Sequence, residues 1–199
     1  RSTLFPYTTL FRSGRRKTKE IAVVAMVAAV IGAIFTLMDF IYMPLSAALG
    51  VVFMEITFGI YMLSPLVPMY LVRKPGAAVF GALVVALVNL LLGSPYGVQL
   101  ILANLLEGVA VEIGFAVISR YKGTLANFAL SGILGALFVF GRDFIVFYAM
   151  AFQSFMIPLL IVRILSAVFV GWILTKLIAA ALNKTGATRG FACAEKPAR

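Results

Sequence analysis

Six long apolar segments, separated by short polar junctions, dominate the hydrophobic pattern of this chain. They run from about Glu20 to Tyr42, Leu45 to Val72, Gly76 to Leu92, Val98 to Ser119, Leu125 to Phe140, and from a start within 150–158 to Leu182. About 20 apolar residues in a helix are enough to cross a bilayer. The pattern therefore predicts an all-α integral membrane protein with six transmembrane helices. Pro44 is expected to end the first helix, and Pro65 and Pro68 are expected to kink or split the second.

Positively charged residues cluster at alternate junctions between these segments. Arg15, Arg16, Lys17 and Lys19 precede the first segment, Arg73 and Lys74 follow the second, Arg120 and Lys122 follow the fourth, and Lys184 and Arg189 follow the sixth. Among the remaining junctions, only the one after the fifth segment carries a cation, Arg142, and it stands beside Asp143. Cytoplasmic loops of membrane proteins carry the excess of Lys and Arg. The bias therefore predicts that both termini lie in the cytoplasm.

Composition excludes several classes of function. The 199 residues are 63% hydrophobic and 12% charged, with a formal charge of +10 and a mean hydropathy of +1.08, which no water-soluble domain shows. Because the cations follow the topology, we interpret the charge as an orientation signal rather than as nucleic-acid binding. The sequence has no histidine, one cysteine (Cys193) and no G-x-x-x-x-G-K-[ST] motif. We therefore expect no enzyme activity, no metal and no cofactor or ATP site within this sequence.

The chain is expected to divide into one membrane domain and two polar ends. Residues 1–14 lack the sustained apolar core of a signal peptide, so they are expected to be a non-native or disordered leader. Residues 15–182 are expected to form the membrane domain, and no internal repeat is evident in them. Residues 183–199 are expected to form a loose, polar cytoplasmic tail.

Two glutamates interrupt the fourth apolar segment, in the stretch NLLEGVAVEIGF at 104–115. A charge near the centre of a bilayer costs about 2.5–3.5 kcal/mol on insertion scales, so each acid requires a reason. Glu107 falls near mid-membrane and follows Asn104 by three residues, which places both on one face of a helix. Glu112 is about 140° round the helix from Glu107 and deeper toward the cytoplasm. Asn104 and Glu107 are therefore the better candidates for a pocket, and Glu112 is expected to face another helix.

Further polar residues fall in the outer halves of the neighbouring segments. They are Asp39, Glu55, Asn89 and Gln99, with Tyr96 in the junction before the fourth segment. Together with Asn104 and Glu107, they predict a polar cavity in the outer half of the membrane. Acids without a matching number of cations indicate a cationic or hydrogen-bond-donating ligand. The aromatic residues expected to stack on it are Tyr61, Tyr96 and Tyr148.

A structural role stays open for each of these acids. Glu55 could bond across helices, and Glu112 could pair with Arg163 of the sixth segment. Either acid could also be protonated. We interpret Arg163 as a structural partner rather than a clamp on the substrate. For Glu55, Asn104 and Glu107 as a group, ligand binding is favoured, because intramembrane acids mark functional sites by default.

Small residues follow one face of the first segment. Ala25, Ala29 and Ala33 recur every four residues, and small side chains allow another helix to approach closely. The pattern indicates a docking face, although alanine is also common in membrane helices generally.

Residues 70–115, YLVRKPGAAVFGALVVALVNLLLGSPYGVQLILANLLEGVAVEIGF, resemble the substrate-binding S component of energy-coupling factor (ECF) vitamin importers. The R-K-P-G-A-A junction, the L-L-G-x-P-x-G turn and the G-x-x-x-E run carry the resemblance. It is closest to the YkoE-type subgroup, which is linked to thiamine or its hydroxymethylpyrimidine precursor. The resemblance extends over about residues 15–182.

The resemblance implies a six-helix subunit of a prokaryotic cell membrane that captures a small cationic vitamin. Its partners would be a transmembrane coupling subunit and two ATPase subunits, which consume the ATP. The alanine face is similar to the A-x-x-x-A motif by which S components dock on the coupling subunit. Glu55 and Glu112 fall where the family has acids, and the resemblance therefore adds Glu112 to the residues placed by depth and helical face. The candidate substrate-binding residues are Glu55, Asn89, Tyr96, Asn104, Glu107 and Glu112. Acids and aromatic rings suit the thiazolium and aminopyrimidine of thiamine.

Two other functions stay open. A stand-alone cation- or proton-coupled carrier would use Asp39, Glu55 and Glu107 as a relay, but it would need an inverted repeat or matching broken helices. A membrane enzyme or assembly scaffold is the third possibility, and this sequence offers no histidine for it. Recovery of two ATPases and a membrane partner would support the importer subunit, whereas transport by the purified chain alone would support the carrier.

Overall fold

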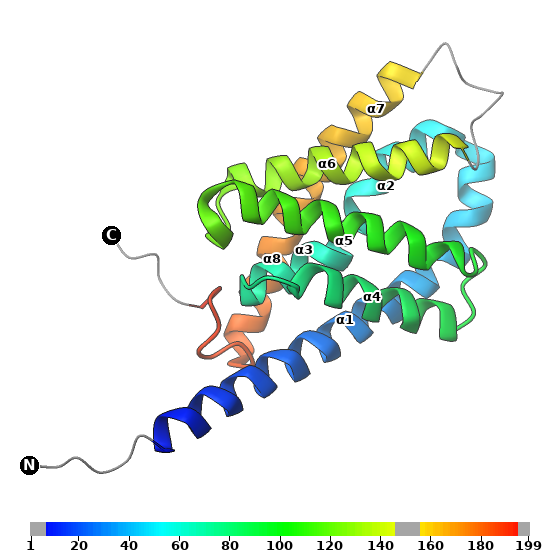
Figure 1. Ribbon diagram of the computed structural model, residues 1–199. Helices are drawn as coiled ribbons and strands as arrows, with labels where there is room; N and C mark the ends of the chain where they lie inside the picture. The colour runs from blue at the N-terminus through cyan, green and yellow to red at the C-terminus, as the bar shows by residue number, and fades with distance from the viewer. Residues whose placement is uncertain (1–6, 146–155, 195–199) are drawn as a thin grey trace, which may run out of the picture.

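The computed structural model describes residues 7–145 and 156–194, and these residues form a bundle of helices without any strand (Figure 1). The helices are α1 (Tyr7–Leu49), α2 (Val51–Tyr61), α3 (Leu63–Val72), α4 (Ala77–Leu91), α5 (Gln99–Val117), α6 (Leu125–Asp143), α7 (Met156–Leu165) and α8 (Gly171–Thr185). A short 3₁₀ turn, Ser119–Tyr121, follows α5, and a π-helical turn, Ser166–Val170, joins α7 to α8.

Five helical stretches in the described part of the chain are long and apolar enough to cross a membrane. They are Thr18–Leu49, Val51–Val72, Gln99–Val117, Leu125–Asp143 and Met156–Thr185. The remaining predicted span, α4, is apolar but has 15 residues, which is about 22 Å of helix. The all-α, multi-span prediction is confirmed, whereas the orientation of the termini stays a prediction.

The first helix is longer at both ends than the apolar segment predicts. α1 starts at Tyr7, within the expected leader; residues 1–6 of that leader lie outside the described residues. At its other end α1 continues through Pro44 to Leu49, so the prediction that Pro44 ends it was wrong. A proline removes one backbone hydrogen bond, which a long packed helix can tolerate. Gly50 ends α1 instead, at a positive φ of 79° that glycine adopts without strain.

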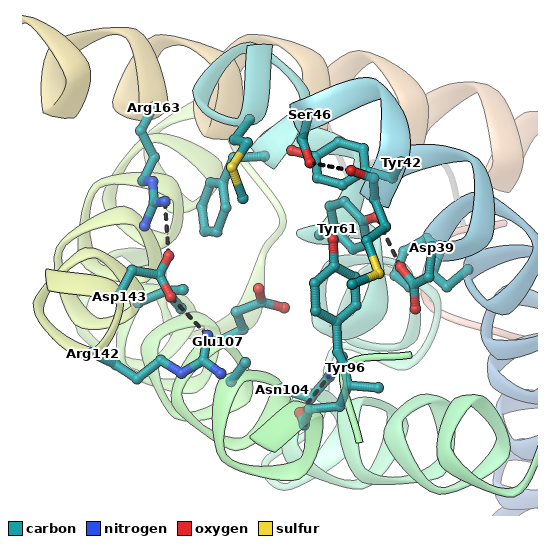
Figure 2. A pocket seen from close by; sticks show the side chains of 17 residues that line it. Asp39, Tyr42, Ser46, Tyr61, Tyr96, Asn104, Glu107, Arg142, Asp143 and Arg163 are labelled. Carbon is teal, nitrogen blue, oxygen red and sulfur yellow. Dashed lines mark hydrogen bonds and ion pairs between the residues drawn. The ribbon is translucent and has the colours of Figure 1, made fainter. Parts of the chain in front are cut away.

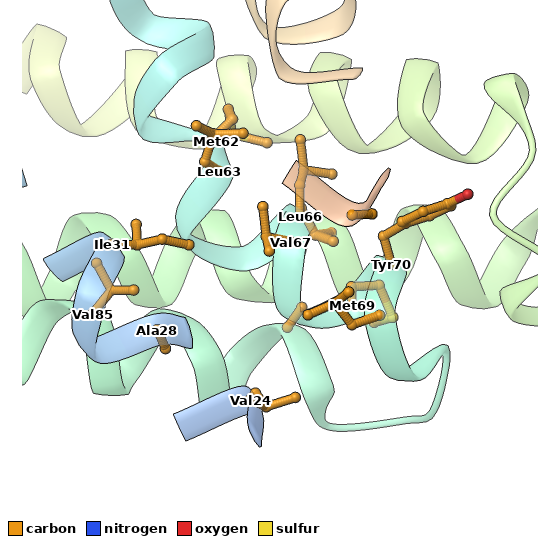
Figure 3. Packing of buried hydrophobic residues seen from close by; sticks show 14 of the residues in the cluster. Val24, Ala28, Ile31, Met62, Leu63, Leu66, Val67, Met69, Tyr70 and Val85 are labelled. Carbon is orange, nitrogen blue, oxygen red and sulfur yellow. The ribbon is translucent and has the colours of Figure 1, made fainter. Parts of the chain in front are cut away.

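The predicted split of the second segment is confirmed and lies at Met62, between α2 and α3. Pro65 has no N–H to donate to the carbonyl of Tyr61, so the helical ladder breaks one turn before it. All ten residues of α3 are buried, which makes α3 the central helix of the bundle. Figure 3 shows side chains of α1, α3 and α4 in this core; those labelled are Val24, Ala28, Ile31, Met62, Leu63, Leu66, Val67, Met69, Tyr70 and Val85.

The polar C-terminal segment packs against the bundle as far as residue 194, so the prediction of a loose tail was wrong for this part. Phe191 is 2% exposed, and the backbone N–H of Cys193 donates to the carbonyl of Leu71. Lys19 of α1 donates to the carbonyl of Arg189 and lies 5.7 Å from the centroid of the Phe191 ring. The buried ring of Phe191, a backbone hydrogen bond to α3 and a hydrogen bond from Lys19 of α1 therefore hold the segment against the bundle.

Candidate functional site

A cavity of about 300 Å³ lies at the end of the bundle where the 93–97 turn joins α4 to α5 (Figure 2). This is the end opposite Arg73 and Lys74, which precede α4 (Figure 1). The lining residues come from α1, α2, the 93–97 turn, α5, α6 and α7: Phe35, Asp39, Tyr42, Met43, Ser46, Met54, Phe58, Tyr61, Tyr96, Leu100, Ala103, Asn104, Glu107, Val139, Arg142, Asp143 and Arg163. A polar cavity at this end is what the sequence predicted.

Aromatic rings form the wall of the cavity on the side of α1 and α2. The ring centroids of Phe35 and Tyr61 are 5.0 Å apart, and Tyr42 meets Tyr61 edge-on at 5.6 Å. Tyr96, which is half-buried, adds a further ring from the 93–97 turn. Tyr61 and Tyr96 line the cavity, and their stacking on a ligand stays a prediction, whereas Tyr148 lies outside the described residues.

Asp39 organises this aromatic wall. Its carboxylate is fully buried and accepts hydrogen bonds from the hydroxyl of Tyr61 (2.9 Å), from Nδ2 of Asn89 (3.0 Å) and from the hydroxyl of Ser94 (2.7 Å). These three donors satisfy the buried carboxylate with hydrogen bonds. Asn89 itself accepts from Thr36 and stands behind Asp39. Asn89 does not line the cavity, so the structure corrects its prediction as a direct contact and makes it a support for Asp39.

A chain of charged groups forms the opposite wall. Arg163 of α7 donates through Nε and Nη2 to both oxygens of Glu55, and Nη2 also lies 2.8 Å from Oδ2 of Asp143. Arg142 donates to Oδ1 of Asp143 (2.7 Å) and to Oε1 of Gln99 (2.9 Å). The chain thus joins α2, α7, α6 and the start of α5.

The network changes the interpretation of three residues. Glu55 is fully buried beside Arg163 and does not line the cavity, so its predicted ligand contact is replaced by an ion pair across helices. Arg163 is confirmed as a structural partner. Asp143 lies beside Arg142 in the sequence, so the sequence alone predicts a junction there rather than part of the site. Two guanidinium groups facing two carboxylates leave this wall without net charge.

Close packing of α2 on the π-helical turn brings this wall together. The N–H of Gly59 donates to the hydroxyl of Ser166 at 2.9 Å. Gly59 lies one helical turn after Glu55, and Ser166 lies three residues after Arg163. A Cβ at position 59 would lie 2.2 Å from the carbonyl oxygen of Ser166, so only glycine permits this approach. The π-helical turn, a feature frequent at functional sites, thereby positions Arg163 toward Glu55.

Glu107 is the acid of the cavity that lacks a partner among the described residues. It is 4% exposed, lines the cavity, and forms no hydrogen bond or ion pair with any of the described residues. In Figure 2 its carboxylate lies between the arginine wall and the tyrosines. Asn104, one turn earlier, also lines the cavity, but its amide already accepts from Ser64 and donates to the carbonyl of Leu100. The predicted shared face of Asn104 and Glu107 is confirmed.

Glu112 lies away from the cavity and caps another helix. Its Oε1 accepts the backbone N–H of Ala78 at 3.0 Å, in the first turn of α4, where the preceding Gly76 provides no side-chain cap. A carboxylate at the start of a helix is stabilised by the unpaired N–H groups and the helix dipole. The possible pairing of Glu112 with Arg163 is therefore wrong, and the expectation that it faces another helix is confirmed.

The alanine face of α1 remains at the surface of the bundle. Ala25, Ala29 and Ala33 are half-buried, at the border between the packed side of α1 and its exposed side, where Met26 and Val30 are 61% and 60% exposed. A partner helix can reach them without any change of the fold, but docking itself stays a prediction.

Comparisons with known proteins agree with this architecture. Residues 19–138 match the family model of the permease component of an ABC-type cobalt transport system. The chain is 28% identical over 178 residues to a protein of Bacillus subtilis (strain 168) named as an HMP/thiamine permease, YkoE, and the match covers 88% of this chain and 89% of that protein. A crystal structure of an S component of an ECF transporter superposes with a TM-score of 0.81 and 28% identity, covering 87% of this chain and 89% of the other.

These relatives are transport proteins rather than enzymes, and each match covers most of both chains. The chain therefore belongs to the family of ABC-type cobalt transport system permease components, and it is an S component of the ECF type, similar to YkoE.

Proposed function

We propose that this S component captures thiamine or its hydroxymethylpyrimidine precursor in the cavity, for import driven by ATPases in separate subunits. The observation that carries the proposal is Glu107, a buried carboxylate that faces the cavity and has no partner among the described residues. A buried charge without a counter-ion is costly, and a cationic ligand would supply the missing partner.

The rest of the cavity favours an aromatic cation. The charges of Arg163 and Arg142 are balanced by Glu55 and Asp143. A cation at Glu107 would therefore meet no net repulsion from that wall. On the other side, the rings of Tyr42, Tyr61 and Tyr96 offer faces and edges for a flat heterocycle or a thiazolium. Asp39 accepts a hydrogen bond from the hydroxyl of Tyr61 and another from the hydroxyl of Ser94. Ser94 in turn accepts one from the backbone N–H of Tyr96.

A metal ion is a poorer fit to the same cavity, although the family model is named for cobalt transport. The sequence contains no histidine. Among the described residues, no group of three or more His, Cys, Asp or Glu side chains is placed to hold a metal. First-row transition metals favour imidazole and thiolate ligands, and one free carboxylate cannot replace them.

The proposal includes the partners and the source of energy. This sequence carries no phosphate-binding P-loop, so ATP would be hydrolysed elsewhere. We propose a transmembrane coupling subunit, docked on Ala25, Ala29 and Ala33, together with two ATPase subunits. Co-purification from the native operon tests this part, and vectorial transport by the purified chain alone would contradict it and favour the stand-alone carrier.

Calorimetric titration of the purified chain tests the substrate. The panel includes thiamine, hydroxymethylpyrimidine, neutral and anionic water-soluble vitamins, and cobalt chloride. A charge-assisted hydrogen bond contributes about 1.5–3 kcal/mol, so Glu107→Gln should weaken thiamine binding roughly tenfold to a hundredfold. Glu112→Gln is the matched control, since it makes the same chemical change on the same helix outside the cavity. Unchanged affinity in Glu107→Gln with lost affinity in Glu112→Gln would move the site to the other face of α5.

A further inference from the structure

Two cationic side chains converge on one tyrosine ring at the end of the bundle opposite the cavity. The guanidinium carbon of Arg73 lies 4.7 Å from the centroid of the Tyr70 ring, and Nζ of Lys176 lies 4.5 Å from it. Lys176 also donates to the hydroxyl of Tyr70 at 2.8 Å. Figure 3 shows Tyr70 at the edge of the core, with its hydroxyl pointing away from the cluster. The three residues join the end of α3 to α8.

No carboxylate among the described residues balances these two cations. Arg73 forms no ion pair or hydrogen bond through its side chain in the described part of the chain, and its Nε is buried without an acceptor. The acids that the structure describes at this end are engaged elsewhere. Glu20 pairs with Lys74, and Glu112 caps α4. A tyrosine ring attracts cations, but it does not neutralise two positive charges held close together.

The backbone holds Arg73 in this position. Arg73 ends α3 in the left-handed conformation, with φ 52° and ψ 43°, which is uncommon for a residue with a side chain. The neighbouring Gly123 leaves room for it: a Cβ at position 123 would lie 3.0 Å from Nε of Arg73 and 3.0 Å from the ring of Tyr70. The guanidinium is thus positioned by the left-handed backbone at Arg73 and by the space that Gly123 leaves, rather than by a counter-ion among the described residues.

The site borders the surface that faces lipid. Lys176 is half-buried, and on the same helix Ile173 and Leu177 are 47% and 59% exposed. α8 is part of the membrane-crossing stretch Met156–Thr185, and Arg73 immediately follows the crossing stretch that ends at Val72. We infer that Arg73 and Lys176, over Tyr70, bind the phosphate of an anionic phospholipid headgroup. A guanidinium offers a fork of N–H donors suited to phosphate, and basic pockets between membrane helices take such headgroups.

Native mass spectrometry and thermal unfolding of the full chain, with added phosphatidylglycerol or phosphatidylcholine, test the inference. Arg73→Asn removes the cation and keeps a residue that tolerates the left-handed conformation, and Lys176→Gln removes the second cation. Lys184→Gln is the control, because Lys184 is an exposed cation at the same end. We expect phosphatidylglycerol to bind the wild type and raise its unfolding temperature. Each site variant should bind it about fivefold more weakly, and Lys184→Gln should bind as the wild type does.

Three results would overturn the lipid site. The first is phosphatidylglycerol binding in Arg73→Asn equal to that of the wild type. The second is equal stabilisation by inorganic phosphate alone, which would indicate a site for a free anion. The third is normal lipid binding in both site variants together with loss of the coupling subunit on co-purification, which would assign the cations to a protein partner. Thiamine titration of each variant checks that it is folded, since the vitamin cavity lies at the other end.

Discussion

Replacing Arg163 with methionine should destabilise the protein more than any other single change in the wall of the cavity. The substitution keeps an unbranched apolar side chain but removes the guanidinium that pairs with the fully buried Glu55, whereas Asp143 keeps Arg142. Removing one partner of a buried ion pair costs about 3–5 kcal/mol. For a domain of this size, that corresponds to a fall of about 6–20 °C in the unfolding temperature.

A double variant separates the loss of the ion pair from the loss of packing. Glu55→Gln together with Arg163→Met removes both charges, so the double variant should unfold at a higher temperature than Arg163→Met alone. The measurement is thermal unfolding in detergent without ligand, followed by tryptophan fluorescence or scattering. If Arg163→Met unfolds at the wild-type temperature, or if the double variant is less stable than it, the ion pair does not hold α7 on α2.

Three further predictions concern the start of α4, the alanine face and the orientation in the membrane. Glu112→Gln should lower the free energy of unfolding by about 0.3–1 kcal/mol, because the charge at the start of α4 is lost, and it should leave thiamine affinity unchanged. Thermal unfolding measures the stability and calorimetry the affinity, and a lost affinity would contradict the placement of Glu112 outside the cavity. Ala29→Trp should abolish association with the coupling subunit on co-purification and leave ligand binding intact; if both are lost, the alanine face is part of the fold. In a background without the native cysteine, Lys122→Cys should react with an impermeant maleimide only from the cytoplasmic side and Tyr96→Cys only from outside, and the reverse labelling would invert the topology.

The features that the sequence determined are those set by neighbouring residues along one helix. The six apolar segments follow from the length and hydropathy of each stretch. The split of the second segment follows from Pro65, which cannot donate to the carbonyl four residues before it. The shared face of Asn104 and Glu107, and the different face of Glu112, follow from the rotation of about 100° per residue in an α-helix.

Only the tertiary structure decided which polar groups are paired. Glu55 and Arg163 are 108 residues apart in the chain, and they meet because Gly59 lets α2 approach the π-helical turn. Asn89 lies at the expected depth, yet it supports Asp39 from behind because α4 packs on α1 with that face inward. Helical periodicity gives the direction of a side chain around its own axis, whereas its partner depends on how distant helices rotate and cross. Among the described residues, Glu107 lacks a partner, whereas Asp39 and Asp143, the other acids that line the cavity, are held by groups from other helices or turns.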